Sequence, residues 1–306
     1  MICSTEGEAK LKPRASTAQA PLEDGWYLYG IIRLGPGERA TASTGTTGLH
    51  VADAPLDLGP AHKLVQLLER GGIAAIVRRV PLADFTAEAL RDRLGDPAGL
   101  SAAVQLHNDV IRAIHQERAV LPAKFGAVYA RLDDVAAAID RQAEALLAQL
   151  EWLDGCDEWA VHVYVDQRIV REAVRADQAL EPARQQLATA SPGRAYFLRR
   201  QLDEALATKT AHVVEEIALA AYQRLARLAT DGVAERPAGP SGGADGDVEV
   251  LRAAFLVRRE RSEEFVAEVR AGADDGRGGR CTYSGPWPPY SFAAIQERGG
   301  DDHQDA

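Results

Sequence analysis

The sequence predicts an α+β protein of two domains, in which helices pack against small, mostly antiparallel sheets. The chain has 306 residues, which is enough for two domains of ordinary size. Apolar residues make up 46% and charged residues 26%, as is usual for globular proteins. Short β-branched or alternating runs also recur between long segments with helical periodicity.

The predicted domain boundaries follow from shifts in composition. Residues 1–25 mix basic and acidic side chains without an apolar run, and residues 297–306 are polar, so we expect disordered tails there. Between them we expect an N-terminal α+β domain over 26–155 and a C-terminal α+β domain over 156–296.

The N-terminal domain is predicted to begin with a sheet. Residues 26–32 are aromatic and β-branched and indicate a buried strand, followed by a mobile Gly/Thr/Ser-rich loop over 34–48. Apolar runs at 63–69 and 73–77 flank Gly71-Gly72 and favour a β-hairpin. The alternative is one amphipathic helix that ends at Gly71.

Two helices should complete this domain. The first covers 100–119 and ends before Pro122, which begins a short extended segment. The second helix follows, with Asp133 as its expected N-cap. The apolar faces that identify the two helices consist of Leu100, Val104, His107, Ile111 and Ile114 in the first, and Val135, Ile139, Gln142, Leu146 and Leu150 in the second.

The C-terminal domain is predicted to begin with the alternating strand 159–165. Helical segments should follow over 169–189, interrupted near Pro182, and over 195–230. The second has an apolar stripe that we expect to be mostly internal, with a partly exposed stripe for protein contacts as the alternative. Its members are Leu198, Leu202, Ala205, Val213, Ile217, Ala221, Leu225 and Leu228.

A Gly/Pro-rich linker is expected over 231–247, before a strand over 248–257 and a short helix over 263–271. The last strand, 281–284, should end at Ser284 because the prolines that follow cannot donate to a sheet.

Composition disfavours several functional classes. The net charge of −10 disfavours contacts with nucleic acids and with anionic membranes. The three cysteines, Cys3, Cys156 and Cys281, are far apart and suggest neither a disulfide framework nor a zinc site. No apolar run reaches the roughly 20 residues of a membrane helix, and no signal peptide is apparent. We therefore expect a cytoplasmic protein.

The sequence offers no set of residues typical of catalysis. It lacks the short signatures of phosphate loops, zinc proteases and serine hydrolases. His107 and His115 are eight residues apart on one helix, too far to share a metal ion, and His107 is expected in the core. Arg199 and Arg200 follow Tyr196 and suggest either a solvated face or a partner site. We therefore predict no catalytic, cofactor-binding or metal-binding residues.

Six segments together resemble the gas vesicle protein GvpL/GvpF family. They lie at 26–31, 71–81, 107–126, 158–161, 193–200 and 284–292, and the most specific is Gly-Pro-Trp-Pro-Pro-Tyr at 285–290. The motif residues on which the resemblance rests, with structural or interaction roles, are His107, Pro122, Phe125, Gly126, Trp159, Tyr196, Arg199, Arg200, Gly285, Pro286, Trp287, Pro288, Pro289 and Tyr290.

The resemblance implies a non-enzymatic, cofactor-free accessory or minor structural protein that is required for gas vesicle formation. It implies a cytoplasmic location at the vesicle and contacts with the hydrophobic shell protein GvpA and other accessory proteins. It also implies a C-terminal domain with a modified ferredoxin-like fold and long helices.

Two alternatives remain open from the sequence. One is an α+β protein that binds a small molecule in a cleft between its domains. The other is a ligand for proline-reading modules through Pro286 and Pro289. For the segment 285–290 we expect a stiff corner whose aromatic side chains, together with Phe292, fold back onto the core, with an exposed aromatic knob for a partner as the alternative.

Overall fold

The computed structural model describes most of the chain between Asp24 and Ala293. The described residues are 24–35, 43–44, 50–53, 65–86, 88–89, 91, 95, 97–235, 247–272 and 279–293. The predicted tails, apart from Asp24 and Gly25, lie outside them, as do most of the loop over 34–48 and residues 236–246. Asp24 and Gly25 already belong to the first strand.

The N-terminal sheet contains seven strands within the described residues, paired antiparallel in the order β2-β3-β4-β5-β1-β6, with β7 also on β1. The predicted hairpin is confirmed as β4 and β5. Gly71 and Gly72 have φ values of 57° and 86°, which a two-residue hairpin loop requires. The strands are β1 (Asp24–Arg33), β2 (Ser43–Thr44), β3 (His50–Asp53), β4 (Gln66–Arg70), β5 (Ile73–Pro81), β6 (Val120–Pro122) and β7 (Val128–Tyr129).

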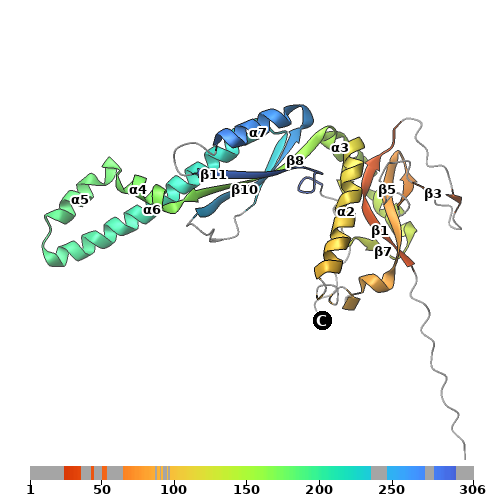
Figure 1. The fold of residues 1–306 in the computed structure, drawn as a ribbon, viewed down its shortest axis with the longest axis horizontal. Coiled ribbons are helices and arrows are strands. Elements are labelled where there is room, and N and C mark those ends of the chain that lie inside the picture. Colours follow the sequence, from red (N-terminus) through yellow and green to blue (C-terminus); the bar gives the residue numbers. More distant parts are fainter. Residues whose placement is uncertain are drawn as a thin grey trace, which may run out of the picture.

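Helices cover both faces of this sheet (Figure 1). Helix α2 (Pro97–Glu117) packs on the face that carries Tyr27 and Tyr29, and α3 (Leu132–Leu153) packs on the face that carries Leu28 and Ile31. Burial on both faces explains why β1 is apolar almost throughout. A 3-10 turn, η2 (Leu82–Phe85), follows β5.

The expected N-cap of α3 is wrong. The helix begins at Leu132, and the residue before it, Arg131, makes no side-chain cap hydrogen bond. Asp133 lies instead inside the first turn, where a negative charge is favourable beside the positive end of the helix dipole.

The C-terminal sheet has the strand order β11-β8-β10-β9, and all its pairs are antiparallel. Its strands are β8 (Cys156–Asp166), β9 (Asp231–Glu235), β10 (Asp247–Arg258) and β11 (Gly279–Trp287). The predicted linker therefore begins too early, since its first five residues form β9 at the sheet edge. The sheet and its helices follow a β-α-β-β-α-β order; membership of the ferredoxin-like folds stays a prediction.

The first strand of this sheet leads into a helical hairpin. Helix α4 (Gln167–Arg175), the 3-10 turn η3 (Gln178–Leu180) and α5 (Glu181–Ala188) run outward, and α6 (Pro192–Ala226) returns. The predicted interruption is confirmed just ahead of Pro182, which lies in the first turn of α5. After β10, a 3-10 turn η4 (Arg259–Arg261) leads into helix α7 (Ser262–Ala271), which packs with the end of α6 on one sheet face.

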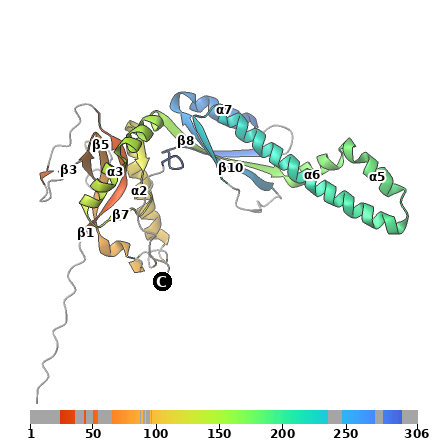
Figure 2. The ribbon, with the colours of Figure 1, turned by 180° about the vertical axis from the view of Figure 1, so that it is seen from behind.

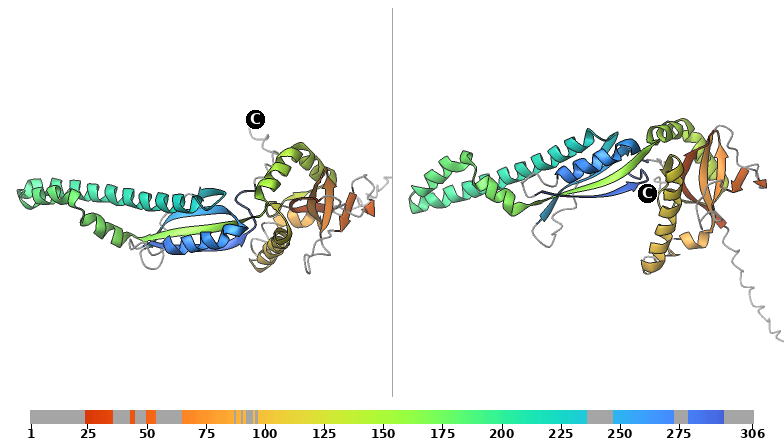
Figure 3. Two further views of the ribbon diagram at one scale, coloured as in Figure 1. Left: turned by 90° about the horizontal axis from the view of Figure 1, so that it is seen from above. Right: turned by 45° about the horizontal axis from the view of Figure 1, so that its top comes forward.

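Residues 167–216 project beyond the sheet as an arm (Figure 3). The only buried residues of α6 are Ile217, Ala221 and Leu225, all in its last third. The expectation that most of the α6 stripe is internal is therefore wrong for the first 25 residues of the helix. The sheet is too short to cover them, and α4 and α5 cover them only in part (Figure 2).

One apolar core joins the two halves of the molecule. It contains Leu28 and Ile31 of the N-terminal sheet and the α3 residues that cover them. The same cluster includes Leu256 of the C-terminal sheet and Phe292 from the segment after β11. Each half also has a buried cluster of its own, and the shared cluster joins them because both halves contribute side chains to it.

The contrast between core and arm gives a stability prediction. Phe265 is fully buried between Phe255 and Trp159. Replacing it by alanine should lower the free energy of unfolding by about 3–5 kcal/mol in urea titrations. The same truncation at exposed Phe197 should change it by less than about 0.5 kcal/mol. Equal losses would contradict the burial described here.

Candidate functional site: the junction and the arm

The first group of motif residues forms an aromatic cluster under α2. The Nδ1 atom of His107 lies 2.8 Å from the hydroxyl of Tyr27, and its ring stacks on Tyr29 at 5.6 Å. Phe125 meets the same ring edge-on at 5.7 Å, and the backbone N–H of Gly126 donates to the Tyr27 hydroxyl. The structure therefore brings residues of two of the six segments together, 26–31 and 107–126.

This cluster holds its histidine neutral. His107 is 3% exposed. Burial lowers its pKa to about 4 and raises the pKa of Tyr27 to about 12. A general base for reactions near pH 7 needs a pKa close to that pH. The geometry therefore fits a packing role for His107.

Two further motif residues are buried, one in each half of the molecule. Pro122 is buried on β6, where it lies opposite Gly30 of β1. Trp159 is buried between Phe265 and Tyr283 under the helices of the C-terminal sheet.

The segment 285–290 turns away from the sheet at Gly285. This glycine has φ 144°, and a Cβ there would lie 2.9 Å from both the carbonyl oxygen of Glu158 and the ring of Trp159. Any side chain would therefore clash with β8. Among the described residues, the peptide bond Gly285–Pro286 is the one in the cis form.

The expected end of the last strand at Ser284 is wrong. Strand β11 continues to Trp287, which pairs with Glu158 after an irregularity in register. Pro286 interrupts the ladder without ending it, because the register irregularity skips Gly285 and Pro286, and the strand then ends before Pro288.

Aromatic side chains of this segment contact α2 of the N-terminal half. The hydroxyl of Tyr290 donates to Asn108 Oδ1 at 2.9 Å, and the guanidinium of Arg112 lies 5.5 Å from the centre of the Trp287 ring. Phe292 is buried in the shared core. The aromatic residues thus fold back as expected, although Trp287 and Tyr290 remain partly exposed.

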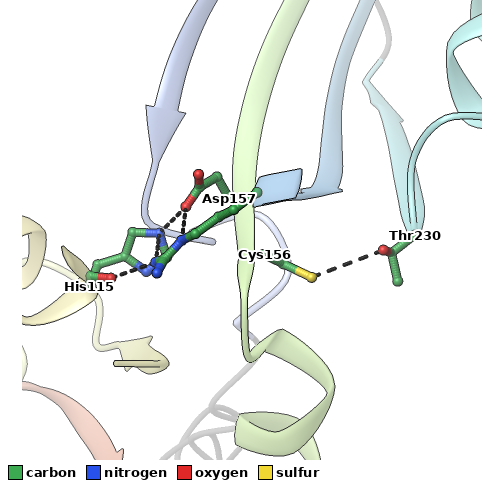
Figure 4. Close-up of polar contacts among 5 residues, drawn as sticks. His115, Cys156, Asp157 and Thr230 are labelled. Atoms are coloured by element: carbon green, nitrogen blue, oxygen red, sulfur yellow. Dashed lines mark hydrogen bonds and ion pairs between the residues drawn. The ribbon is translucent and has the colours of Figure 1, made fainter. Parts of the chain in front are cut away.

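A charged cluster forms a second contact between the halves (Figure 4). Asp157 at the start of β8 accepts from His115 Nε2 at 2.8 Å and from Arg259 Nε at 3.0 Å. Arg259 also donates to the backbone carbonyl of His115 at 2.6 Å. Burial raises the pKa of Asp157, but the hydrogen bonds from His115 and Arg259 outweigh it, so the net pKa is lowered.

The neighbouring carboxylate secures the end of the chain. Glu158 is buried and accepts from the backbone N–H and the hydroxyl of Ser291 at 2.7 and 2.8 Å. Burial raises its pKa. Sequence reasoning missed both clusters. The sequence feature that could have revealed them is the pair Asp157 and Glu158 at the start of an otherwise apolar strand, because buried carboxylates need hydrogen-bond partners.

The remaining motif residues lie far from this junction. Tyr196, Arg199 and Arg200 are exposed near the start of α6, at the far end of the arm (Figure 1). The structure therefore separates the motif residues into two places, the junction region with its adjoining cores and the arm.

Two kinds of site are absent from the part of the chain that the structure describes. Within it, no three His, Cys, Asp or Glu side chains are grouped so that they could hold a metal ion. None of the described helices combines the length and apolar character needed to cross a bilayer.

Comparison with known proteins identifies the family. The family model described as gas vesicle synthesis protein GvpL/GvpF matches residues 25–294. The chain belongs to the GvpL/GvpF family. Among curated relatives, gas vesicle protein L of a Streptomyces species is 32% identical over 241 residues, which cover 79% of this chain and 87% of the relative. Gas vesicle protein F of the same strain is 29% identical, over 77% of this chain and 90% of the relative.

Solved structures show the same fold. The crystal structure of GvpF from Anabaena matches with a TM-score of 0.63 at 19% identity, over 90% of this chain and all of the other. That of GvpF from Microcystis aeruginosa matches with a TM-score of 0.54 at 18% identity, over 88% of this chain and 99% of the other. The α+β architecture with two antiparallel sheets is therefore that of GvpF.

The charged cluster at the junction gives a first prediction for this site. Replacing Asp157 by asparagine leaves Arg259 without its counter-charge and should lower the free energy of unfolding by about 1.5–3 kcal/mol. The matched control is Asp140→Asn, which breaks the exposed Arg70–Asp140 pair and should cost much less, because solvent screens an exposed pair. Urea titration followed by tryptophan fluorescence measures both. An Asp157→Asn loss no larger than the control would argue against a structural role for the cluster.

The neutral His107 predicts a pH dependence. Its folded pKa of about 4 lies below the ordinary 6.5, so unfolding takes up a proton between these values. Stability should therefore fall as the pH decreases from 6.5 to 4, by about 2 kcal/mol after allowance for partial solvation. In plots of the free energy of unfolding against pH, His107→Gln should remove this decrease. His212→Gln, at an exposed position on α6, should keep it. Identical slopes in all three proteins would refute the assignment.

Proposed function

We propose that this chain is an accessory or minor structural protein required for gas vesicle formation, and that it acts through protein contacts rather than catalysis. The observation that supports this most is the GvpL/GvpF family match over residues 25–294. The names of the curated relatives, gas vesicle proteins L and F, support the same role.

The proposed contacts are with the shell protein GvpA and with other gas vesicle accessory proteins, in the cytoplasm. A shell that encloses gas presents apolar surface to it, so its subunits tend to aggregate before assembly. A partner with a net charge of −10 stays dispersed, and this charge also disfavours contacts with nucleic acids and anionic membranes. Exposed apolar side chains on the arm supply surface for such contacts.

The alternative of a small molecule bound between the halves has little support. Leu256 and Phe292 of the shared core occupy the junction, together with Glu158 and its hydrogen-bond partner Ser291. A binding cleft needs an open, mostly apolar cavity with a few converging polar groups. The buried carboxylates here are already satisfied by protein partners.

Deletion tests the proposal. In a cell that forms gas vesicles, removing the gene for this chain should abolish flotation and the vesicles seen by electron microscopy. Supplying the chain from a plasmid should restore both. The control is an unchanged level of the shell protein in the deletion strain. Normal vesicles in that strain would show that the proposal is wrong.

A further inference from the structure

The end of the arm carries an unusual apolar surface. Tyr196 and Phe197 are 64% and 67% exposed, more than any other large apolar side chain among the described residues. Their rings lie 5.7 Å apart in an edge-to-face arrangement. Adjacent exposed aromatic rings are typical of contact sites, because aromatic side chains are enriched where proteins bind each other. We call residues 189–200 the tip.

The charge around the tip is opposite to that of the whole chain. Residues 182–202 contain four arginines and no aspartate or glutamate, whereas the chain carries a net charge of −10. Arg200 pairs with Glu204 at 3.0 Å. Arg194 and Arg199 have no ion pair within the described part of the chain. The tip is therefore a local positive surface.

The start of α6 adds to this field. The helix begins at Pro192, and the preceding Ser191 makes no side-chain cap hydrogen bond. The first N–H groups of a helix have no partner within it, and the helix dipole is positive there. Both effects favour a carboxylate next to Arg194.

A groove lies further along the arm and begins near Asp203; its lining carries both charges, since Asp203 and Glu215 of α6 line it as well as two arginines. A cavity of about 540 Å³ between α4 and α6 has Arg171 and Arg175 on its α4 side. Tyr196 lies on the same side of α6 as the groove residues Ala207 and Val214, since spacings of 11 and 18 residues are close to whole numbers of helical turns. A peptide segment that contacts the tip can therefore continue along the groove.

We propose that the tip is a docking site for an acidic protein segment, which places an apolar side chain against Tyr196 and Phe197 and carboxylates against Arg194 and Arg199. The inference rests on the proposed function, since it takes the partner to be another gas vesicle protein. A second copy docked tip to tip would bring like charges together. An anionic bilayer is the other partner whose charge would match the arginines, and the crosslinking experiment below distinguishes it from a protein segment.

Site-specific photocrosslinking identifies the occupant. The full-length chain, with Phe197 replaced by benzoylphenylalanine, is produced in vesicle-forming cells, and crosslinked peptides are identified by mass spectrometry. The expected product joins position 197 to a gas vesicle protein segment in which an apolar residue has carboxylates beside it. The same probe at Leu219, which is 56% exposed on the same helix, should not reach that segment. Products with lipid only, with this chain only, or with a basic or uncharged segment would overturn the proposal, as would no product.

Variants then test the two parts of the contact. Tyr196→Ser with Phe197→Ser, and separately Arg194→Gln with Arg199→Gln, should each reduce the co-purified partner about tenfold. Leu219→Ser, and Arg131→Gln just before α3 combined with Arg141→Gln on α3, should leave it within about twofold. Circular dichroism checks that α6 remains folded. Added salt should weaken partner binding to the unmodified chain more than to the arginine variant. Partner recovery that is unchanged in the tip variants would refute the proposal.

The outcome separates this proposal from the proposed function. If deletion abolishes vesicles while the tip variants restore them and keep their partner, the docking site is wrong and the proposed function stands. If vesicles form without the chain, the proposed function fails, whatever the tip binds.

Discussion

The fold depends on the apolar core that α3 shares between the two sheets. One side of this helix covers the N-terminal sheet, and the same cluster of buried residues continues to Leu256 of the C-terminal sheet and to Phe292. Burial of apolar area is the main favourable term in folding. Because both halves contribute to one cluster, separating them would expose apolar surface on each. The junction is therefore part of the fold and is more than a linker.

Polar contacts at the rim of this core set the orientation of the halves. Asp157 joins β8 to the end of α2 through His115, and Tyr290 joins the segment after β11 to the middle of α2. Hydrogen bonds are directional, whereas apolar contact is not. The rim contacts therefore fix the angle between the two halves, which the apolar core alone would leave free. The consequence is a defined direction for the arm, which leaves the opposite end of the C-terminal sheet (Figure 3).

The arm differs from the rest of the molecule in its energetics. Over residues 192–216 no side chain of α6 is buried, so this part of the helix gains little from packing. Helices of this kind rely on local pairs such as Arg200 with Glu204 and on contacts with neighbouring helices. A long, thinly packed arm that ends in two exposed aromatic rings fits a protein whose role is to contact others.

Much of the fold could be predicted from local patterns. The alternation of 159–165, the Gly71-Gly72 turn and the periodic face of 100–119 each depend on neighbours in sequence, and the structure confirms all three. Strand β9 was missed because it is a polar edge strand without an apolar pattern. The exposure of α6 was missed because its stripe is periodic throughout, and only the length of the sheet decides how much of it is covered.

The candidate site was harder to predict than the fold. The motif residues were found from the family resemblance, yet the contacts that assemble the junction join positions far apart in the chain. Tyr290 and Asn108 are 182 residues apart, and Arg259 and His115 are 144 apart. Side-chain type alone does not pair such positions. The carboxylates of Asp157 and Glu158 signalled a need for partners but could not name them.

If the junction holds the arm in a fixed direction, the distance between α3 and the arm in solution is confined to a narrow range. Spin labels are attached at Glu144 on α3 and at Gln201 on the arm, which are both exposed. Pulsed electron paramagnetic resonance then measures the distribution of distances between the two labels. Cys3 and Cys281 are replaced by serine, and Cys156 is buried. A fixed direction of the arm should give one narrow distance peak in this protein. A broad distribution without a dominant peak would contradict it.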